Sequence, residues 1–516
     1  MIRRFFTVGG FTLLSRITGF GRDVVMAAIL GAGPIADAFF VAFRLPNHFR
    51  AIFAEGAFAA AFVPAYARTL EQDGKLAARS FADRLALALV ILQVVLLVVA
   101  LIYTPAVVRL LAPGLADDAQ RFDLAVALTR ITFPYLALIS IESLIAGTLN
   151  ANNRFASAAG APVLLNLAMI GTLTYAALFP SAGHAAAWGV LIAGVLQLLL
   201  VAGDAERNGL GLRLKLPKLD EPTKKFLKAL GPAVIGAGGV QLALFADTII
   251  ATFLPTGALS ALYYADRINQ LPIGVVGIAV GIVLLPEMAR RLAAGDEKGA
   301  AASQGKAIEF ALLLAVPCAA ASLVIPELIM RALFARGAFT AADAAAAGQT
   351  LAAYATGLIP FVLMRSFVAP FHARGDTTTP VIAALVAVAL NIALKIALMG
   401  TLAQVGLALA TAAGAWLNLM LLIWFARRHG FARPGTNTLG NSVRLIAAGI
   451  ILAVVLYFGV RWLAPHFAKL PSLRDEALLL VAAIGGGIAY AALIFAFLGR
   501  AWLKGLLRSA EPVTKA

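Results

Sequence analysis

The sequence predicts an all-α integral membrane protein with about fourteen transmembrane helices, and three observations lead to this prediction. Hydrophobic residues make up 61% of the 516 residues, and the mean hydropathy is +0.90. Charged residues make up only 13%, about half the fraction of a soluble domain. The apolar runs approach about 20 residues, the length of a membrane-crossing helix, rather than the alternating segments of a membrane barrel.

Windowed hydropathy places the expected spans along the whole chain. The first apolar run is interpreted as a span and not as a cleavable signal peptide, because it is long and lacks a clear small-residue cleavage site. The fourteen spans are expected near residues 5–30, 34–65, 82–111, 122–149, 156–179, 184–203, 226–254, 258–288, 307–333, 346–372, 378–399, 403–426, 440–463 and 476–499.

The loops between these spans alternate in charge. Basic segments are "MIRR" before the first span, the loops after spans two, six, eight and twelve, and the tail "GRAWLKGLLRS", whereas loops such as "GAGP" and "APGLADDAQ" are short or acidic. Because Lys and Arg accumulate in cytoplasmic loops, both termini are expected in the cytoplasm. The same rule explains the net charge of +16 without a nucleic-acid partner. The single cysteine, Cys318, excludes an internal disulfide and is expected to be inert core.

The two halves of the chain resemble each other. "DAFFVAFRLPN" from Asp37 aligns with "SALYYADRINQLP" from Ser260, and "FVPAYAR" and "FPYLALIS" align with "LLPEMAR" and "IPFVLMRS" at nearly the same offset. Such matches predict an internal duplication, here of six spans, in the parallel-repeat arrangement of many transporters. We therefore expect two pseudo-symmetric six-helix lobes, 1–215 and 216–432, followed by two further helices and a tail in 433–516.

Charged residues interrupt the first span in the stretch "RITGFGRD" (16–23). An ionisable group inside a span costs several kcal/mol unless it is paired or hydrated, so it marks a candidate functional site. Arg16 and Asp23 are seven residues apart and share a helical face. Arg22 has no opposite charge three or four residues away. A hydrated cavity is expected here, and an ion pair within or between helices is the alternative.

The second span carries polar residues at intervals of seven, four and seven, a stripe within about 40° on an ideal helix. We expect the stripe to face a water-filled lumen, because the rest of the helix is apolar. Pro46 is expected to kink the helix. The stripe consists of Asp37, Arg44, His48 and Glu55, and Asn47 and Arg50 lie beside it.

Three later spans also contain polar or charged residues. In the eighth span, Arg267 shares one helical face with Tyr263 and Gln270. The seventh span contains Asp247, and the eleventh contains Lys395. An ion pair between Asp247 and Lys395 is a further hypothesis.

Arginines outnumber carboxylates around the predicted lumen, and this balance favours an anionic ligand. A guanidinium remains charged and grips phosphate in a bidentate fork. A cationic ligand would call for carboxylates and aromatic rings. The sequence contains no Walker A motif, no Cys/His metal spacing and no nucleophile elbow. A carrier of a phosphate or pyrophosphate compound, with no cofactor and no metal, is therefore expected in place of an enzyme or an ATP-driven pump.

The segment "SRITGFGRDVVMAAILGAGPIADAFFVAFRLPNHFRAIFAEGAFAAAFVP" (15–64) resembles the N-terminal signature of the MurJ (MviN) lipid II flippases of the MOP exporter superfamily. "YYADRINQLPIGVVGIAVGIVLLPEMAR" (263–290) is similar to that family's eighth span. The resemblance covers essentially the whole chain. It implies two lobes that face each other, with a groove for a polyprenyl tail at the last two helices.

The resemblance also implies a function. The family moves lipid II, the undecaprenyl-pyrophosphate-linked peptidoglycan precursor, from the inner to the outer leaflet of the bacterial cytoplasmic membrane. The expected partners are therefore lipid II and membrane lipids, with cell-wall synthesis proteins as a further expectation. The implied substrate contacts are Arg16, Arg22, Arg50 and Arg267, with Asp23, Asp37, Asn47 and Glu55 at matching motif positions and Arg44 where a relative can carry lysine.

The chain departs from the family's pattern at two places. Gln270 stands where some relatives have an acid. Asp247 and Asn391 resemble part of a sodium site, but Lys395 stands in place of its second acid. Since a fixed ammonium group can occupy the ion's place, we expect transport without a bound sodium ion.

Three other functions stay open at this point. A flippase for another polyprenyl-linked oligosaccharide, of the O-antigen type, shares the fold and the phosphate argument. A cation-coupled small-molecule exporter is disfavoured by the arginine-rich lumen. A scaffold for cell-wall synthases would not transport at all.

Overall fold

A computed structural model describes residues 2–50, 57–218, 220–431 and 434–508. All regular secondary structure in these ranges is helical, and the prediction of an all-α membrane protein is confirmed. Nine helical segments of the described ranges are long and apolar enough to cross a membrane. The 51-residue segment Thr378–Arg428 accounts for two predicted spans, because Ala403 interrupts it with φ 44° and ψ −128°. The backbone then folds back, so that a Cβ on Gly406 would lie 2.7 Å from the Leu398 carbonyl oxygen.

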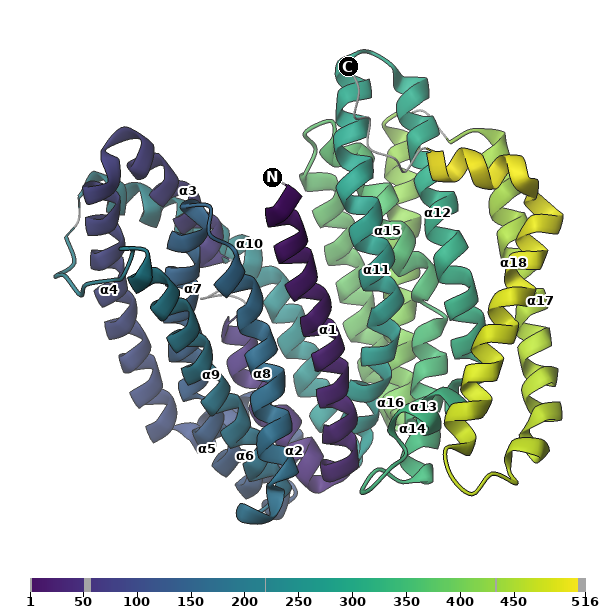
Figure 1. Cartoon of the computed structure of the whole chain (residues 1–516), viewed down its shortest axis with the longest axis horizontal. Helices are drawn as coiled ribbons and strands as arrows, with labels where there is room; N and C mark the ends of the chain where they lie inside the picture. The colour runs from purple at the N-terminus through teal and green to yellow at the C-terminus, as the bar shows by residue number, and fades with distance from the viewer. Residues whose placement is uncertain (1, 51–56, 219, 432–433, 509–516) are drawn as a thin grey trace. The chain divides into compact units, whose positions relative to one another are not determined.

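The chain divides into two compact units, which are described separately. Unit 1 comprises Met1–Ser260 and Arg336–Thr340. Its helices are α1 (Ile2–Leu30), α2 (Pro34–Arg50), α3 (Ala57–Gln72), α4 (Gly74–Ile102), α5 (Thr104–Leu111), α6 (Ala119–Thr132), α7 (Pro134–Ala151), α8 (Ala156–Thr174), α9 (Ala182–Arg207) and α10 (Glu221–Thr252), with 3-10 turns η2 (Pro113–Leu115) and η3 (Ala176–Leu178) (Figure 1).

Unit 2 comprises Ala261–Ala335 and Ala341–Ala516. Helix α11 (Ala258–Ala293) begins in unit 1 and continues into unit 2. The other helices of unit 2 are α12 (Glu297–Val324), α13 (Pro326–Phe334), α14 (Ala341–Ala355), α15 (Leu358–His372), α16 (Thr378–Arg428), α17 (Thr436–Phe467) and α18 (Arg474–Arg508).

Several predicted spans consist of two helices joined at a proline. Pro105, Pro134 and Pro326 each occupy one of the first two positions of α5, α7 and α13. Proline is favourable there because the first turn of a helix has no internal partner for its N–H groups. The sequence analysis located these spans but did not divide them.

Helix α10 packs on α3 in unit 1. Phe226 of α10 makes edge-on ring contacts with Phe58 of α3 and Phe81 of α4, with ring centroids 5.6 and 6.2 Å apart. The first segment of unit 1 therefore extends to residue 260 and includes the helix expected to open the second lobe. The lobes 1–215 and 216–432, and the terminal segment 433–516, stay a prediction about the internal duplication.

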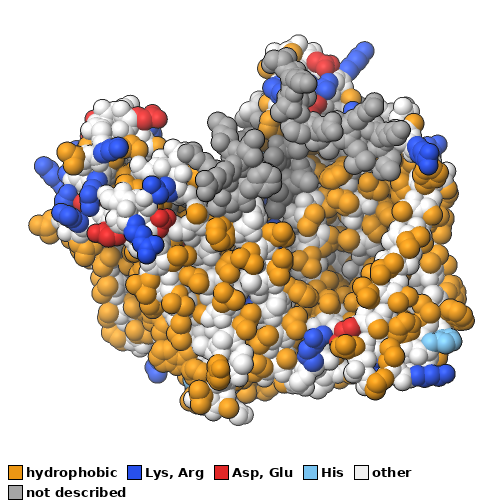
Figure 2. All heavy atoms as spheres, in the orientation of Figure 1, with side chains coloured by type: hydrophobic (Ala, Val, Ile, Leu, Met, Phe, Trp, Pro, Cys, Tyr) orange, Lys and Arg blue, Asp and Glu red, His pale blue; other side chains and the backbone are white. Residues whose placement is uncertain are grey.

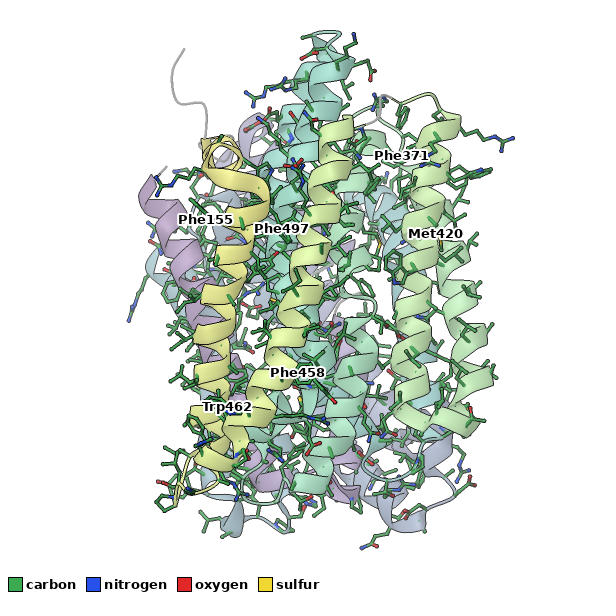
Figure 3. The ribbon with its side chains drawn as sticks, turned by 90° about the vertical axis from the view of Figure 1, so that its right-hand side faces the viewer. Phe155, Phe371, Met420, Phe458, Trp462 and Phe497 are labelled. Atoms are coloured by element: carbon green, nitrogen blue, oxygen red, sulfur yellow. The ribbon has the colours of Figure 1, made fainter. Side chains whose placement is uncertain are left out.

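Apolar side chains cover the outside of the helices, as a lipid environment requires. Val94, Val95, Val98 and Val99 of α4 are each about half exposed. On the face shown in Figure 2, hydrophobic side chains cover the middle of the left-hand unit, and Lys and Arg gather at its upper end. On unit 2, Phe458 of α17 lies on the outer surface (Figure 3).

Small residues let helices α8 and α9 approach closely, and this contact can be tested. A Cβ on Gly189 of α9 would lie 2.9 Å from the Met169 Cα and would overlap the Thr172 hydroxyl. Gly189→Leu is therefore expected to separate the helices and to cost about 1–3 kcal/mol, the usual cost of overpacking. The measurement is the thermal unfolding midpoint of the purified protein.

Gly171→Leu is the matched control, because a Cβ on Gly171 would meet nothing within 4 Å. Equal unfolding midpoints for the two variants would contradict the packing argument.

Candidate functional site

The charged stretch of α1 contains a buried ion pair. Arg22 and Asp23 are only 3% and 2% exposed. The Arg22 Nη2 and Nε atoms lie 2.7 and 3.1 Å from one carboxylate oxygen of Asp23. In this conformation Arg22 is thus paired with its neighbour in the same helix. The sequence analysis gave such an ion pair as the alternative to a hydrated cavity. Arg16, two turns earlier, is exposed.

Asn166 of α8 holds α1 just before this pair, and the sequence analysis missed it. Its side-chain amide donates to the Ser15 carbonyl oxygen (3.0 Å) and to the Thr18 hydroxyl (3.1 Å). Gly19 makes this approach possible, since its Cβ would already lie 3.4 Å from the Asn166 amide nitrogen. The signal available in the sequence was a single amide in the apolar run "PVLLNLAMIG".

Asp37, at the start of α2, is fully buried. One carboxylate oxygen accepts a hydrogen bond from the Gly257 N–H (2.7 Å), and the other accepts from the Ser260 N–H (3.1 Å) and hydroxyl (2.8 Å). Gly257 directly precedes α11 and Ser260 lies in its first turn, where a helix offers the N–H groups no partners of its own. Asp37 therefore caps α11, and the expectation that it faces a water-filled lumen does not hold in this structure.

The other described polar residues of α2, on the stripe and beside it, are partly accessible. The Arg50 Nε atom donates to the Asn47 side-chain oxygen (2.9 Å), which orients the guanidinium from one turn below. Arg44 is partly buried. The side chain of His48 and the whole of Glu55 lie outside the described residues.

In unit 2, the predicted site residue is Arg267 on α11. Its guanidinium carbon lies 5.5 Å from the ring centre of Tyr263, one turn earlier, which is cation–π range. Further along α11, a Cβ on Gly277 would lie 3.7 Å from the Nε atom of Arg365. Arg365 is an exposed cation of α15 that the sequence analysis did not single out, although it interrupts the apolar run "FVLMRS".

The residues that resemble a sodium site include a buried ammonium. Lys395 on α16 is 4% exposed, one turn after Asn391, and Asp247 lies on α10 of unit 1. Sodium requires oxygen donors, so a buried lysine at this position does not fit the ion. Within the described residues, no cluster of three or more His, Cys, Asp or Glu could hold a metal. The Asp247–Lys395 pair would join the two units and stays a prediction.

The fold defines the class of protein first. The structure matches an inward-facing multidrug-resistance MATE transporter of the MOP superfamily with a TM-score of 0.67 and 15% identity, over 82% of this chain and 97% of that one. It matches the inward closed conformation of a lipid II flippase MurJ with a TM-score of 0.79 and 23% identity, over 95% and 98% of the two chains. The chain thus has the fold of MOP-superfamily transporters.

Sequence comparison then gives the family. The family model "Lipid II flippase MurJ" matches residues 26–473. The chain is 42% identical to a probable lipid II flippase MurJ of Rhizobium meliloti, over 99% of this chain and 96% of the relative. It is 35% identical to the lipid II flippase MurJ of Burkholderia cenocepacia, over 98% of both chains. The chain belongs to the MurJ lipid II flippase family.

The capping role of Asp37 makes a stability prediction. Asp37→Ala removes the acceptor of three hydrogen bonds, and a hydrogen bond to a charged group is worth about 1.5–3 kcal/mol. The variant is expected to lower the thermal unfolding midpoint clearly, and Ser260→Ala, which removes one of the three bonds, to lower it less. Asp117→Ala, at an exposed loop position, is the control. If Asp37→Ala unfolds at the same midpoint as the wild-type protein, Asp37 does not stabilise the start of α11.

Proposed function

We propose that this protein flips lipid II from the cytoplasmic to the periplasmic leaflet of the bacterial cytoplasmic membrane by alternating access. The observation that carries the proposal is family membership over nearly the whole chain, together with arginines inside its membrane helices. Both termini lie in the cytoplasm in this proposal, because the basic loops lie on the same side as the termini. Contact with cell-wall synthesis proteins stays a prediction.

The arginines bind the pyrophosphate of the substrate. Moving a charged headgroup through hydrocarbon is prohibitive unless other groups replace its water. Guanidinium groups do so through charge-assisted, bidentate hydrogen bonds. The proposed ligands are Arg16, Arg22, Arg44, Arg50 and Arg267.

The neighbouring polar residues orient these arginines. Asp23 pairs with Arg22, and Asn47 accepts a hydrogen bond from Arg50. Asp37 caps α11, and its expected contact with the substrate stays a prediction. A substrate role for Glu55 stays a prediction.

An apolar cavity in unit 2 suits the polyprenyl tail. It has a volume of about 320 Å³ and lies between α12 and α18. Because its lining is almost wholly hydrophobic, it can take part of an isoprenoid chain without unsatisfied polar groups. Its lining residues are Leu313, Leu314, Pro317, Gly487, Tyr490, Ala491, Ile494, Phe495 and Gly499.

Loss of the arginines is expected to stop transport. In a bacterium depleted of its own lipid II flippase, the wild-type protein should restore lipid II at the outer face, measured by cleavage with a membrane-impermeant enzyme. Arg22→Ala and Arg267→Ala should each lower the signal about tenfold or more, since each removes charge-assisted bonds to the substrate.

Arg154→Ala, at an exposed turn between α7 and α8, is the matched control and should transport normally. Membrane levels of all variants are compared by immunoblot. Full transport by Arg22→Ala and Arg267→Ala would remove these arginines from the mechanism. If the well-expressed wild-type protein exposes no lipid II, the substrate is another polyprenyl-linked compound.

Transport is expected to be independent of sodium, because Lys395 supplies a fixed positive charge. Replacing sodium by potassium should leave lipid II transport in reconstituted vesicles unchanged. Lys395→Asp restores an acid one turn after Asn391, and sodium should then raise the thermal midpoint of this variant, because ligand binding stabilises the folded state. A sodium-induced rise in the wild-type midpoint would contradict the prediction.

A further inference from the structure

The segment that joins α9 to α10 is fixed to α4 along its length. We call residues 208–218 with Asp220 the linker strap. Asp83 of α4 is fully buried, and its carboxylate accepts a hydrogen bond from the Arg213 N–H (2.8 Å) and pairs with the Lys215 ammonium (3.0 Å). Arg84 forms an ion pair with Asp220. The strap therefore runs beside α4 and is held there by Asp83 and Arg84 (Figure 1).

The strap contains leucines in two different environments. Leu210 and Leu212 pack partly buried against the hydrophobic clusters of unit 1. Leu214 and Leu216, in contrast, are 62% and 84% exposed. Most of the surface of these two side chains is left uncovered. Because burying an exposed leucine is favourable, an apolar environment outside the protein would stabilise this arrangement.

Basic residues flank the two exposed leucines in the sequence. Between residues 207 and 228 the chain has seven Lys and Arg and two acids. In Figure 2, Lys and Arg side chains gather at the upper left, with hydrophobic side chains among them. The seven basic residues, all exposed, are Arg207, Arg213, Lys215, Lys218, Lys224, Lys225 and Lys228.

The chain places the strap at a membrane surface, because it begins where the membrane-crossing helix α9 ends. Positive charge in a loop, taken alone, would explain only the orientation of the helices across the membrane. The exposed leucines between the cations also favour an apolar environment, which water does not provide. Apolar side chains that enter the boundary between headgroups and acyl chains, flanked by Lys and Arg, are typical of interfacial anchors. Each cation near an anionic leaflet strengthens the attraction to that leaflet.

We propose that the linker strap binds the surface of an anionic phospholipid bilayer. Leu214 and Leu216 enter the headgroup boundary, and Arg213 and Lys218 contact lipid phosphates. Because the strap is fixed to α4 by Asp83 and the Arg84–Asp220 pair, the lipid contact holds unit 1 at a constant depth. This anchor is independent of the identity of the transported substrate.

The test measures the depth of position 216 in a bilayer. The full-length protein, with Cys318→Ser and Leu216→Cys, carries a nitroxide label in nanodiscs of phosphatidylcholine with or without phosphatidylglycerol. Collision rates with oxygen, which concentrates in the bilayer, and with a water-soluble nickel chelate report depth. Oxygen collisions should dominate in phosphatidylglycerol discs. Arg213→Gln with Lys218→Gln, or high salt, should shift the balance towards the nickel chelate.

A label at Lys298, an exposed basic position at the start of α12, is the control and should stay nickel-accessible in both discs. If position 216 is as nickel-accessible as position 298 in phosphatidylglycerol discs, the strap faces water or a protein partner and the proposal fails. If position 216 is immersed equally in both discs and is unaffected by the Arg213 and Lys218 changes, the anionic-lipid contact is ruled out.

Discussion

A guanidinium inside a membrane helix is stable only when it is paired or hydrated, and Arg22 places this constraint on α1. The adjacent Asp23 accepts two of its hydrogen bonds, and both side chains are buried. Just before the pair, Asn166 of α8 holds the α1 backbone beside Gly19. The charged stretch is thus held at a fixed place beside α8, and in the proposed function the substrate would meet a guanidinium that is already oriented.

The Arg22–Asp23 pair also limits how a pyrophosphate could bind to Arg22. With Asp23 in contact, the positive charge of Arg22 is largely neutralised in this conformation. A pyrophosphate group that binds Arg22 must share the guanidinium with Asp23 or displace it. If the pyrophosphate shares the guanidinium with Asp23, no buried charge loses its partner during exchange, which avoids the cost of an isolated buried ion.

Much of the fold followed from the sequence, because apolar length and loop charge are dictated by the bilayer itself. The breaks at Pro105, Pro134 and Pro326 were missed, since hydropathy does not register helix ends. For the site, the helical spacing found the charges in α1 and α2 but not their partners. Asp37 was expected to face a lumen because the stripe is regular, yet it caps α11, and a contact 223 residues away cannot be seen in local periodicity.

The central claim is that the arginines recognise the pyrophosphate and not the lipid tail. The direct test is the affinity of the purified protein for undecaprenyl pyrophosphate and for undecaprenol, which lacks the phosphates. The account predicts that Arg22→Ala and Arg267→Ala weaken binding of the pyrophosphate about tenfold or more and leave undecaprenol binding unchanged. Unchanged pyrophosphate affinity, or an equal loss for both ligands, would contradict it.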